Sequence, residues 1–159
     1  MTVKIHWKPL LVSLAIPLGV GALSALLSRP GMADFQETVT QPPLSPPMWL
    51  FPVVWTLLYL LMGLASYLVY TSNAARTEIR KALTLYAAQL AVNFFWSIFF
   101  FNFRWYLFSF LWLLLLWGLI LATLFAFYRI RPAAGYLLIP YLLWVTFAGY
   151  LTFAIYLLN

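Results

Sequence analysis

Five long apolar stretches, none with a charged residue in its interior, make up most of this 159-residue chain. Each has about 19 residues or more, the length an α-helix needs to cross the hydrocarbon core of a bilayer. A backbone in contact with lipid must satisfy its hydrogen bonds internally, which favours helices. The sequence therefore predicts an all-α integral membrane protein, a single five-transmembrane-helix bundle with helices at about 10–28, 47–71, 80–101, 105–128 and 133–158.

Proline and glycine mark the expected helix ends. Arg29-Pro30-Gly31 is expected to end the first helix, because Pro and Gly stop helices. Pro46-Pro47 is expected to open the second, since Pro in a first turn loses no hydrogen bond. A long loop, about residues 29–45, should join them. Lys4 and Lys8 before the first apolar run also resemble a secretory signal, an alternative that the length of the run disfavours.

Basic residues predict the orientation in the membrane. The five spans divide the connecting segments between two sides of the membrane. The side of the N-terminus holds Lys4, Lys8, Arg76, Arg80, Lys81, Arg129 and Arg131, whereas the opposite side holds only Arg29 and Arg104. The positive-inside rule then places the N-terminus in the cytoplasm and the C-terminus outside. The short N-terminal tail is typical of a bacterial protein, which indicates the plasma membrane. No dense basic run exists, so the net charge of +6 indicates topology and lipid contact, and no nucleic-acid partner.

Side chains for acid–base or metal chemistry are scarce. The only acids are Asp34, Glu37 and Glu78, all in expected loops, and the chain has one His and no Cys. His6 alone cannot build a metal site, and the spans hold no members for a proton relay. We therefore expect no metal, no cofactor and no proton-coupled pump. Any enzymatic activity would have to be redox or radical chemistry.

Aromatic and weakly polar residues recur at helical spacing on three of the predicted spans. Residues three or four positions apart share one face of a helix. Turned inwards, these faces would line an apolar pocket with a few hydrogen-bonding groups, as sites for flat organic ligands do. The alternative is that the aromatic residues only pack the bundle or anchor it at the interface. The three stripes are Trp55, Tyr59, Met62 and Ser66; Gln89, Asn93, Trp96 and Phe100; and Tyr141, Trp144, Ala148 and Leu151.

The opposite face of the third span carries small residues. Thr84, Ala87 and Ala91 recur at helical spacing there. Small residues four apart let transmembrane helices approach closely. The pattern of small residues on this face predicts a homodimer seam, the contact between two copies of the chain, at Ala87 and Ala91.

At these residues the sequence resembles the translocator protein family, also called tryptophan-rich sensory proteins or peripheral benzodiazepine receptors. Three blocks carry the resemblance, and it covers nearly the whole chain. Together, in this order and on five spans, the blocks are highly specific. They are Pro46-Pro47-x-Trp49-x-Phe51-Pro52-x-x-Trp55-Thr56-x-x-Tyr59-x-x-Met62-Gly63, Gln89-Leu90-x-x-Asn93-x-x-Trp96 and Pro140-Tyr141-Leu142-x-Trp144-x-x-Phe147-Ala148.

The resemblance implies a dimeric five-helix bundle whose pocket is closed by a lid loop at about residues 29–45. Family members bind porphyrins such as protoporphyrin IX and haem, and some bind cholesterol or synthetic drugs. The implied function is therefore tetrapyrrole binding for transport, buffering or sensing. Carried over residue by residue, the implied ligand-binding residues are Pro46, Pro47, Trp55, Tyr59, Asn93, Trp96, Trp144, Ala148 and Leu151.

Two other functions stay open. Some bacterial relatives support light-dependent oxidative breakdown of bound porphyrin, attributed to two pocket tryptophans that match Trp55 and Trp144, the candidate catalytic residues. The chain could instead be a structural membrane protein without a small ligand. The first loop departs from the family pattern, since Phe35-Gln36 replaces a Trp-Tyr pair and Gln41-Pro42-Pro43-Leu44 replaces a Lys-Pro-x-Trp stretch. Contacts between loop and ligand are therefore expected to differ.

Overall fold

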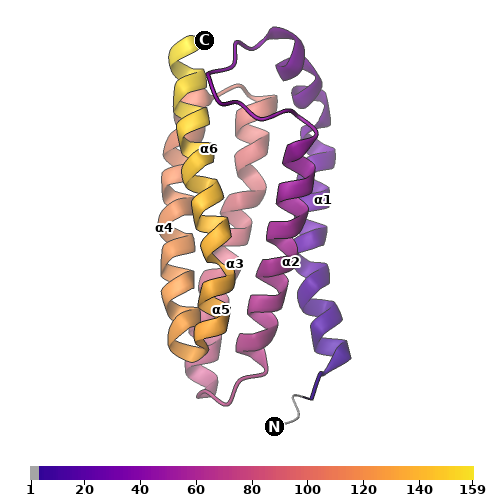
Figure 1. Cartoon of the computed structure of the whole chain (residues 1–159), viewed down its shortest axis with the longest axis vertical. Helices are drawn as coiled ribbons and strands as arrows, with labels where there is room; N and C mark the ends of the chain where they lie inside the picture. The colour runs from indigo at the N-terminus through magenta and orange to yellow at the C-terminus, as the bar shows by residue number, and fades with distance from the viewer. Residues whose placement is uncertain (1–3) are drawn as a thin grey trace.

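Five helices that are long and apolar enough to cross a membrane run side by side along the molecule (Figure 1). The computed structural model describes residues 4–159, and the predicted all-α membrane fold is confirmed. Two of the spans are interrupted and are therefore made of two elements each. In chain order the elements are α1 (Trp7–Thr38), α2 (Leu50–Tyr70), α3 (Arg76–Ser97), the π-helix η1 (Ile98–Asn102), α4 (Tyr106–Ile130), α5 (Pro132–Leu137) and α6 (Ile139–Leu158).

The predicted end of the first helix at Ser28 is wrong, because α1 continues through Pro30 and Gly31 to Thr38. The side-chain amide of Asn102 stands in for one hydrogen bond of the helix. It accepts the N–H of Gly31 (3.2 Å) and donates to the carbonyl of Leu27 (2.7 Å). A side chain inserted into the helical ladder in this way is a recognised cause of bending. The final turns of α1 thus continue over the end of the bundle instead of stopping (Figure 1).

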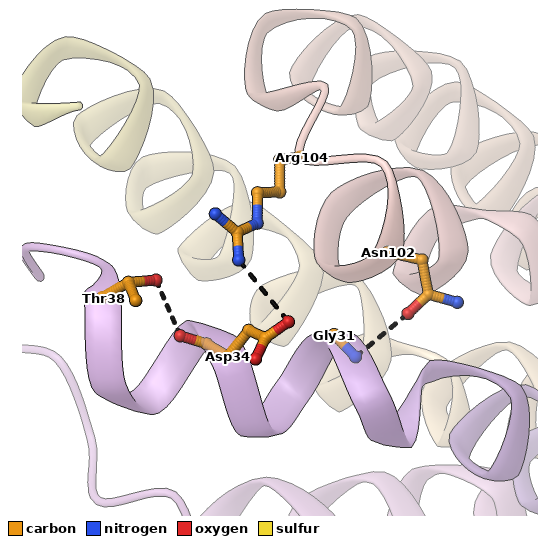
Figure 2. A network of polar contacts seen from close by, with 5 residues as sticks. All are labelled: Gly31, Asp34, Thr38, Asn102 and Arg104. Carbon is orange, nitrogen blue, oxygen red and sulfur yellow. Dashed lines mark hydrogen bonds and ion pairs between the residues drawn. The ribbon is translucent and has the colours of Figure 1, made fainter.

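The segment that covers this end therefore consists of a helical part, 29–38, and a non-helical part, 39–49, in place of the predicted loop at about 29–45. We call residues 29–49 the lid. Figure 2 shows how the turn between η1 and α4 holds the helical part, with Asn102 at Gly31 and Arg104 3.6 Å from the carboxylate of Asp34. The lid is thus fixed to a part of the chain about 70 residues away in sequence.

The lid is also fixed to α6. The side-chain amide of Asn159 accepts the backbone N–H of Thr40 (3.1 Å) and donates to the carbonyl of the same residue (2.9 Å). The hydroxyl of Tyr150 donates to the carbonyl of Pro43 at 2.8 Å. The lid therefore has polar attachments on both of its sides.

Interruptions in the third and fifth spans were not predicted. After Ser97 the helix widens into η1, and this brings Phe100 and Phe101 against Phe35 of the lid, with ring centroids 5.5 and 5.2 Å apart. The fifth span breaks at Leu138, just before Pro140. Proline has no N–H to give to the preceding turn, which accounts for the break. The predicted spans 80–101 and 133–158 are therefore each two elements.

The bundle is held together by an apolar core and by close contacts between helix backbones at glycines, among them Gly63. Met62, Ile120 and Val145 are fully buried at the centre. At Gly63 the backbones of α2 and α1 come so close that a Cβ atom would lie 2.7 Å from the carbonyl oxygen of Ser13. Small residues permit such approaches between transmembrane helices. Ala87 and Ala91 lie exposed on the outer face of α3, so the dimer seam stays a prediction.

Candidate ligand-binding cavity

A cavity of about 540 Å³ lies inside the bundle, beneath the lid. Side chains from α1, α2, α3, η1, α6 and the lid form its wall. Seven of the nine ligand-binding residues implied by the family resemblance line it: Trp55, Tyr59, Asn93, Trp96, Trp144, Ala148 and Leu151. Pro46 and Pro47 do not. They lie in the lid between two residues that do, Ser45 and Met48.

Three tryptophans from three different helices meet at this cavity. Trp55 of α2 lies beside Tyr59, with ring centroids 5.6 Å apart. Trp96 of α3 stacks on Phe100 of η1 at 5.0 Å with an angle of 11° between the rings. Trp144 of α6 meets Phe51 edge to face at 5.8 Å. The structure thus brings together the three stripes that helical spacing had aligned, and it gives the cavity broad aromatic walls.

A chain of buried hydrogen bonds supports the deep end of the cavity. Tyr59 donates its hydroxyl hydrogen to Oδ1 of Asn93 at 3.0 Å, and Nδ2 of Asn93 donates to the hydroxyl oxygen of Tyr141 at 2.7 Å. Tyr141 in turn donates to Oε1 of Gln89 at 2.6 Å. Buried polar groups need such partners, all the more inside a membrane. These three hydrogen bonds fix the orientation of the Asn93 amide and of the Tyr59 ring.

Two indole groups at the cavity wall have no such partner. Within residues 4–159, neither Trp96 Nε1 nor Trp144 Nε1 has a hydrogen-bond acceptor, although both atoms are buried. In contrast, the N–H of Trp112 donates to the carbonyl of Val92 at 2.7 Å. A buried donor without an acceptor is a cost to the fold. Both indoles of the cavity wall thus keep an unused hydrogen-bond donor.

Sequence reasoning missed the contribution of α1. Gly21, Ser24 and Ala25 line the cavity, as does Phe35 of the lid. Ser24 also joins α1 to α3 by hydrogen bonds. Its hydroxyl lies 2.6 Å from that of Ser97 and donates to the carbonyl of Phe94 at 2.9 Å. Ser28, one turn later, donates to the same Ser97 hydroxyl at 3.0 Å. The spacing of four between two serines in an apolar helix was the available signal.

Among residues 4–159, no charged side chain lines the cavity. Gln36, Gln41 and Ser45 supply polar groups at the lid, and the remaining polar residues are Ser24, Tyr59, Asn93, Ser97 and Thr152. In the part of the chain that the structure describes, no cluster of His, Cys, Asp or Glu could hold a metal ion. The site is therefore built for a flat apolar molecule with a few polar groups.

These features define a class, an integral membrane bundle of five spans around an aromatic, uncharged ligand cavity. Residues 13–158 match the TspO/MBR family, and the chain belongs to this family. It is 37% identical to "Tryptophan-rich protein TspO" of Chlorobaculum tepidum over 150 residues, 94% of this chain and 95% of that protein. It is 34% identical to "Tryptophan-rich sensory protein" of Cereibacter sphaeroides (98% and 94% covered) and 35% identical to "Translocator protein" of Homo sapiens (94% and 89%).

Proposed function

We propose that the cavity binds a porphyrin or haem-type tetrapyrrole, and that the protein transports, buffers or senses this ligand. The observation that carries the proposal is the meeting of Trp55, Trp96 and Trp144 at one cavity of about 540 Å³. Aromatic side chains offer large flat contact areas, and offset or edge-on contacts with other rings add to the stabilisation. A flat macrocycle is the kind of ligand that such walls suit.

The polar end of the cavity suggests how the ligand would lie. The described residues that line the cavity carry no charge, so a carboxylate buried deep in the cavity would have no counter-ion among them. Gln36 and Gln41 of the lid are exposed, and Gln36 lies two residues after Asp34, the carboxylate that pairs with Arg104. The ring would therefore lie among the tryptophans, with any acidic groups directed towards the lid.

Titration of the purified protein with protoporphyrin IX in detergent tests the proposal. We expect saturable quenching of tryptophan fluorescence. Trp144→Ala should weaken binding about tenfold or more, because stacking on one aromatic ring typically contributes about 1–3 kcal/mol. Trp117→Ala is the control, since Trp117 lies on the lipid side and donates to Thr146 Oγ1 outside the cavity. No saturable quenching, or equal weakening by both variants, would contradict the proposal.

A second candidate is light-dependent oxidation of the bound porphyrin by dioxygen. Both candidate catalytic residues, Trp55 and Trp144, line the cavity, which favours this reading. Illumination of the complex should then bleach the porphyrin absorbance faster than illumination of free porphyrin. Trp55→Phe with Trp144→Phe should slow the bleaching while much of the binding remains. Bleaching at the unchanged rate in this variant would rule out a role for the two tryptophans.

Three further proposals concern the setting of the protein. We propose a homodimer that meets at Ala87 and Ala91, which are exposed on the outer face of α3. We also propose that the protein lies in a bacterial plasma membrane with its N-terminus in the cytoplasm. The excess of basic residues at that end of the bundle supports the orientation.

A further inference from the structure

A second hollow, a groove on the outer surface between α2 and α6, shares one residue with the cavity. The groove is almost entirely apolar, and Leu57 and Leu143, which line it, are 56% and 64% exposed, so it opens towards lipid. Trp144 lines both the groove and the cavity. The cavity and the groove therefore adjoin at Trp144. The groove is formed by Val54, Leu57, Leu58, Leu61, Pro140, Leu143, Trp144 and Phe147.

The seam between α2 and α6 is closed by side chains alone. α1 packs along α2 and α4 packs along α6, whereas the backbones of α2 and α6 make almost no close contact with each other. Figure 1 shows these two helices in front of α3. Trp144 contacts Phe51 edge to face at 5.8 Å, and its Nε1 has no acceptor in residues 4–159. A turn of this ring therefore breaks no hydrogen bond of its Nε1 and disrupts only aromatic and van der Waals contacts.

The lid closes the other approach to the cavity with polar contacts. Asn159 makes two hydrogen bonds to the backbone of Thr40, and Arg104 pairs with Asp34 at 3.6 Å. Lifting the lid would break these contacts on both sides of it together. Dispersion contacts between carbon atoms are weak one by one, and lipid chains can replace them. The seam is therefore the easier side of the cavity to open.

We infer that the ligand enters the cavity sideways from the bilayer, through the seam between α2 and α6, and that the indole ring of Trp144 is the gate. Apart from the indole N–H of Trp144, the described residues that line the groove have only apolar side chains, so it suits the face of a flat, lipid-soluble polycyclic molecule. The inference deepens the proposed function and rests on it for the identity of the ligand. The route itself can be measured without a porphyrin.

A single thiol in the cavity reports on the route. The chain has no cysteine, so Ala148→Cys places one thiol in the cavity wall. In proteoliposomes, N-pyrenylmaleimide dissolved in the bilayer should label it. Adding Leu57→Trp and Leu143→Trp fills the groove and should slow the labelling at least about tenfold through a higher barrier. Leu64→Trp and Leu157→Trp on the same two helices, 37% and 67% exposed and outside the groove, should leave the rate unchanged.

If the variant with Leu57→Trp and Leu143→Trp is labelled as fast as the control with Leu64→Trp and Leu157→Trp, the inference that the ligand enters between α2 and α6 is wrong. Faster labelling after Asn159→Ala combined with Tyr150→Phe would also overturn it, because these changes remove the three hydrogen bonds between the lid and the α6 end and leave the seam intact. If the tryptophan pair prevents folding, Leu57→Phe with Leu143→Phe provides the same test. Stopped-flow quenching by protoporphyrin IX gives a second measurement, in which groove filling should slow association. Absence of quenching in the wild type would contradict the proposed function, whereas the labelling rates would still decide the route.

Discussion

Replacing Gly63 with leucine is expected to lower the free energy of unfolding by about 3 kcal/mol, the upper end of the usual cost of overpacking. A Cβ atom at this position would lie 2.7 Å from the carbonyl oxygen of Ser13 and 2.8 Å from Cα of Leu14. Both are backbone atoms of α1, so no side-chain rotation relieves the clash. The two helices must move apart, and contacts along their whole interface weaken. Close packing is what holds transmembrane helices together in lipid.

The matched control for this change is Gly118→Leu. Gly118 lies on the outer face of α4, and no atom lies within 4 Å of the place where its Cβ would be. The control should change the free energy of unfolding by about 1 kcal/mol at most, in the stabilising direction, because leucine is the better helix former. Unfolding in mixed micelles with increasing dodecyl sulfate, followed by circular dichroism, measures both variants. Equal stability of the two would show that α1 and α2 do not need the glycine.

Much of the cavity wall was predictable because a helix repeats every 3.6 residues. Once a segment is known to be a helix, spacing alone puts Asn93 and Trp96 on one face, and likewise Trp144 and Ala148. In a bundle of five spans, such a face lies either towards the interior of the bundle or towards lipid. Spacing could not predict which atoms meet. That Asn93 lies between Tyr59 and Tyr141 depends on the relative heights of three helices.

The course of α1 was not predictable from local signals. Pro30 and Gly31 ordinarily end a helix, and here the helix continues because Asn102 bridges Leu27 and Gly31. That partner lies more than 70 residues away, in a π-helix that itself had no clear signal. The position of the lid follows from these contacts. The family resemblance placed Pro46 and Pro47 at the lid, and they lie there, although neither lines the cavity.

Asn93→Leu is the second change with a large expected effect, a loss of about 2 kcal/mol of unfolding free energy. Leucine has a similar size, so little space opens. The hydroxyl of Tyr59 loses its acceptor, and that of Tyr141 loses a donor, inside the bundle. A buried group left without its partner costs more than the bond itself contributed. Because the freed Tyr59 ring lines the cavity, porphyrin affinity should fall as well.

A double-mutant cycle separates the hydrogen bond from simple repacking. Tyr59→Phe combined with Asn93→Leu removes both partners, so part of the lost stability should return, with a coupling of about 1 kcal/mol. Tyr150→Phe is the comparison, since Tyr150 bonds only to the lid through Pro43 and should add independently to Asn93→Leu. Dodecyl sulfate unfolding of the four proteins of each cycle gives both coupling energies. Additive losses for Tyr59 and Asn93 would mean that the hydrogen bond between them contributes nothing to the stability of the bundle, and that the Tyr59 ring is positioned by its packing.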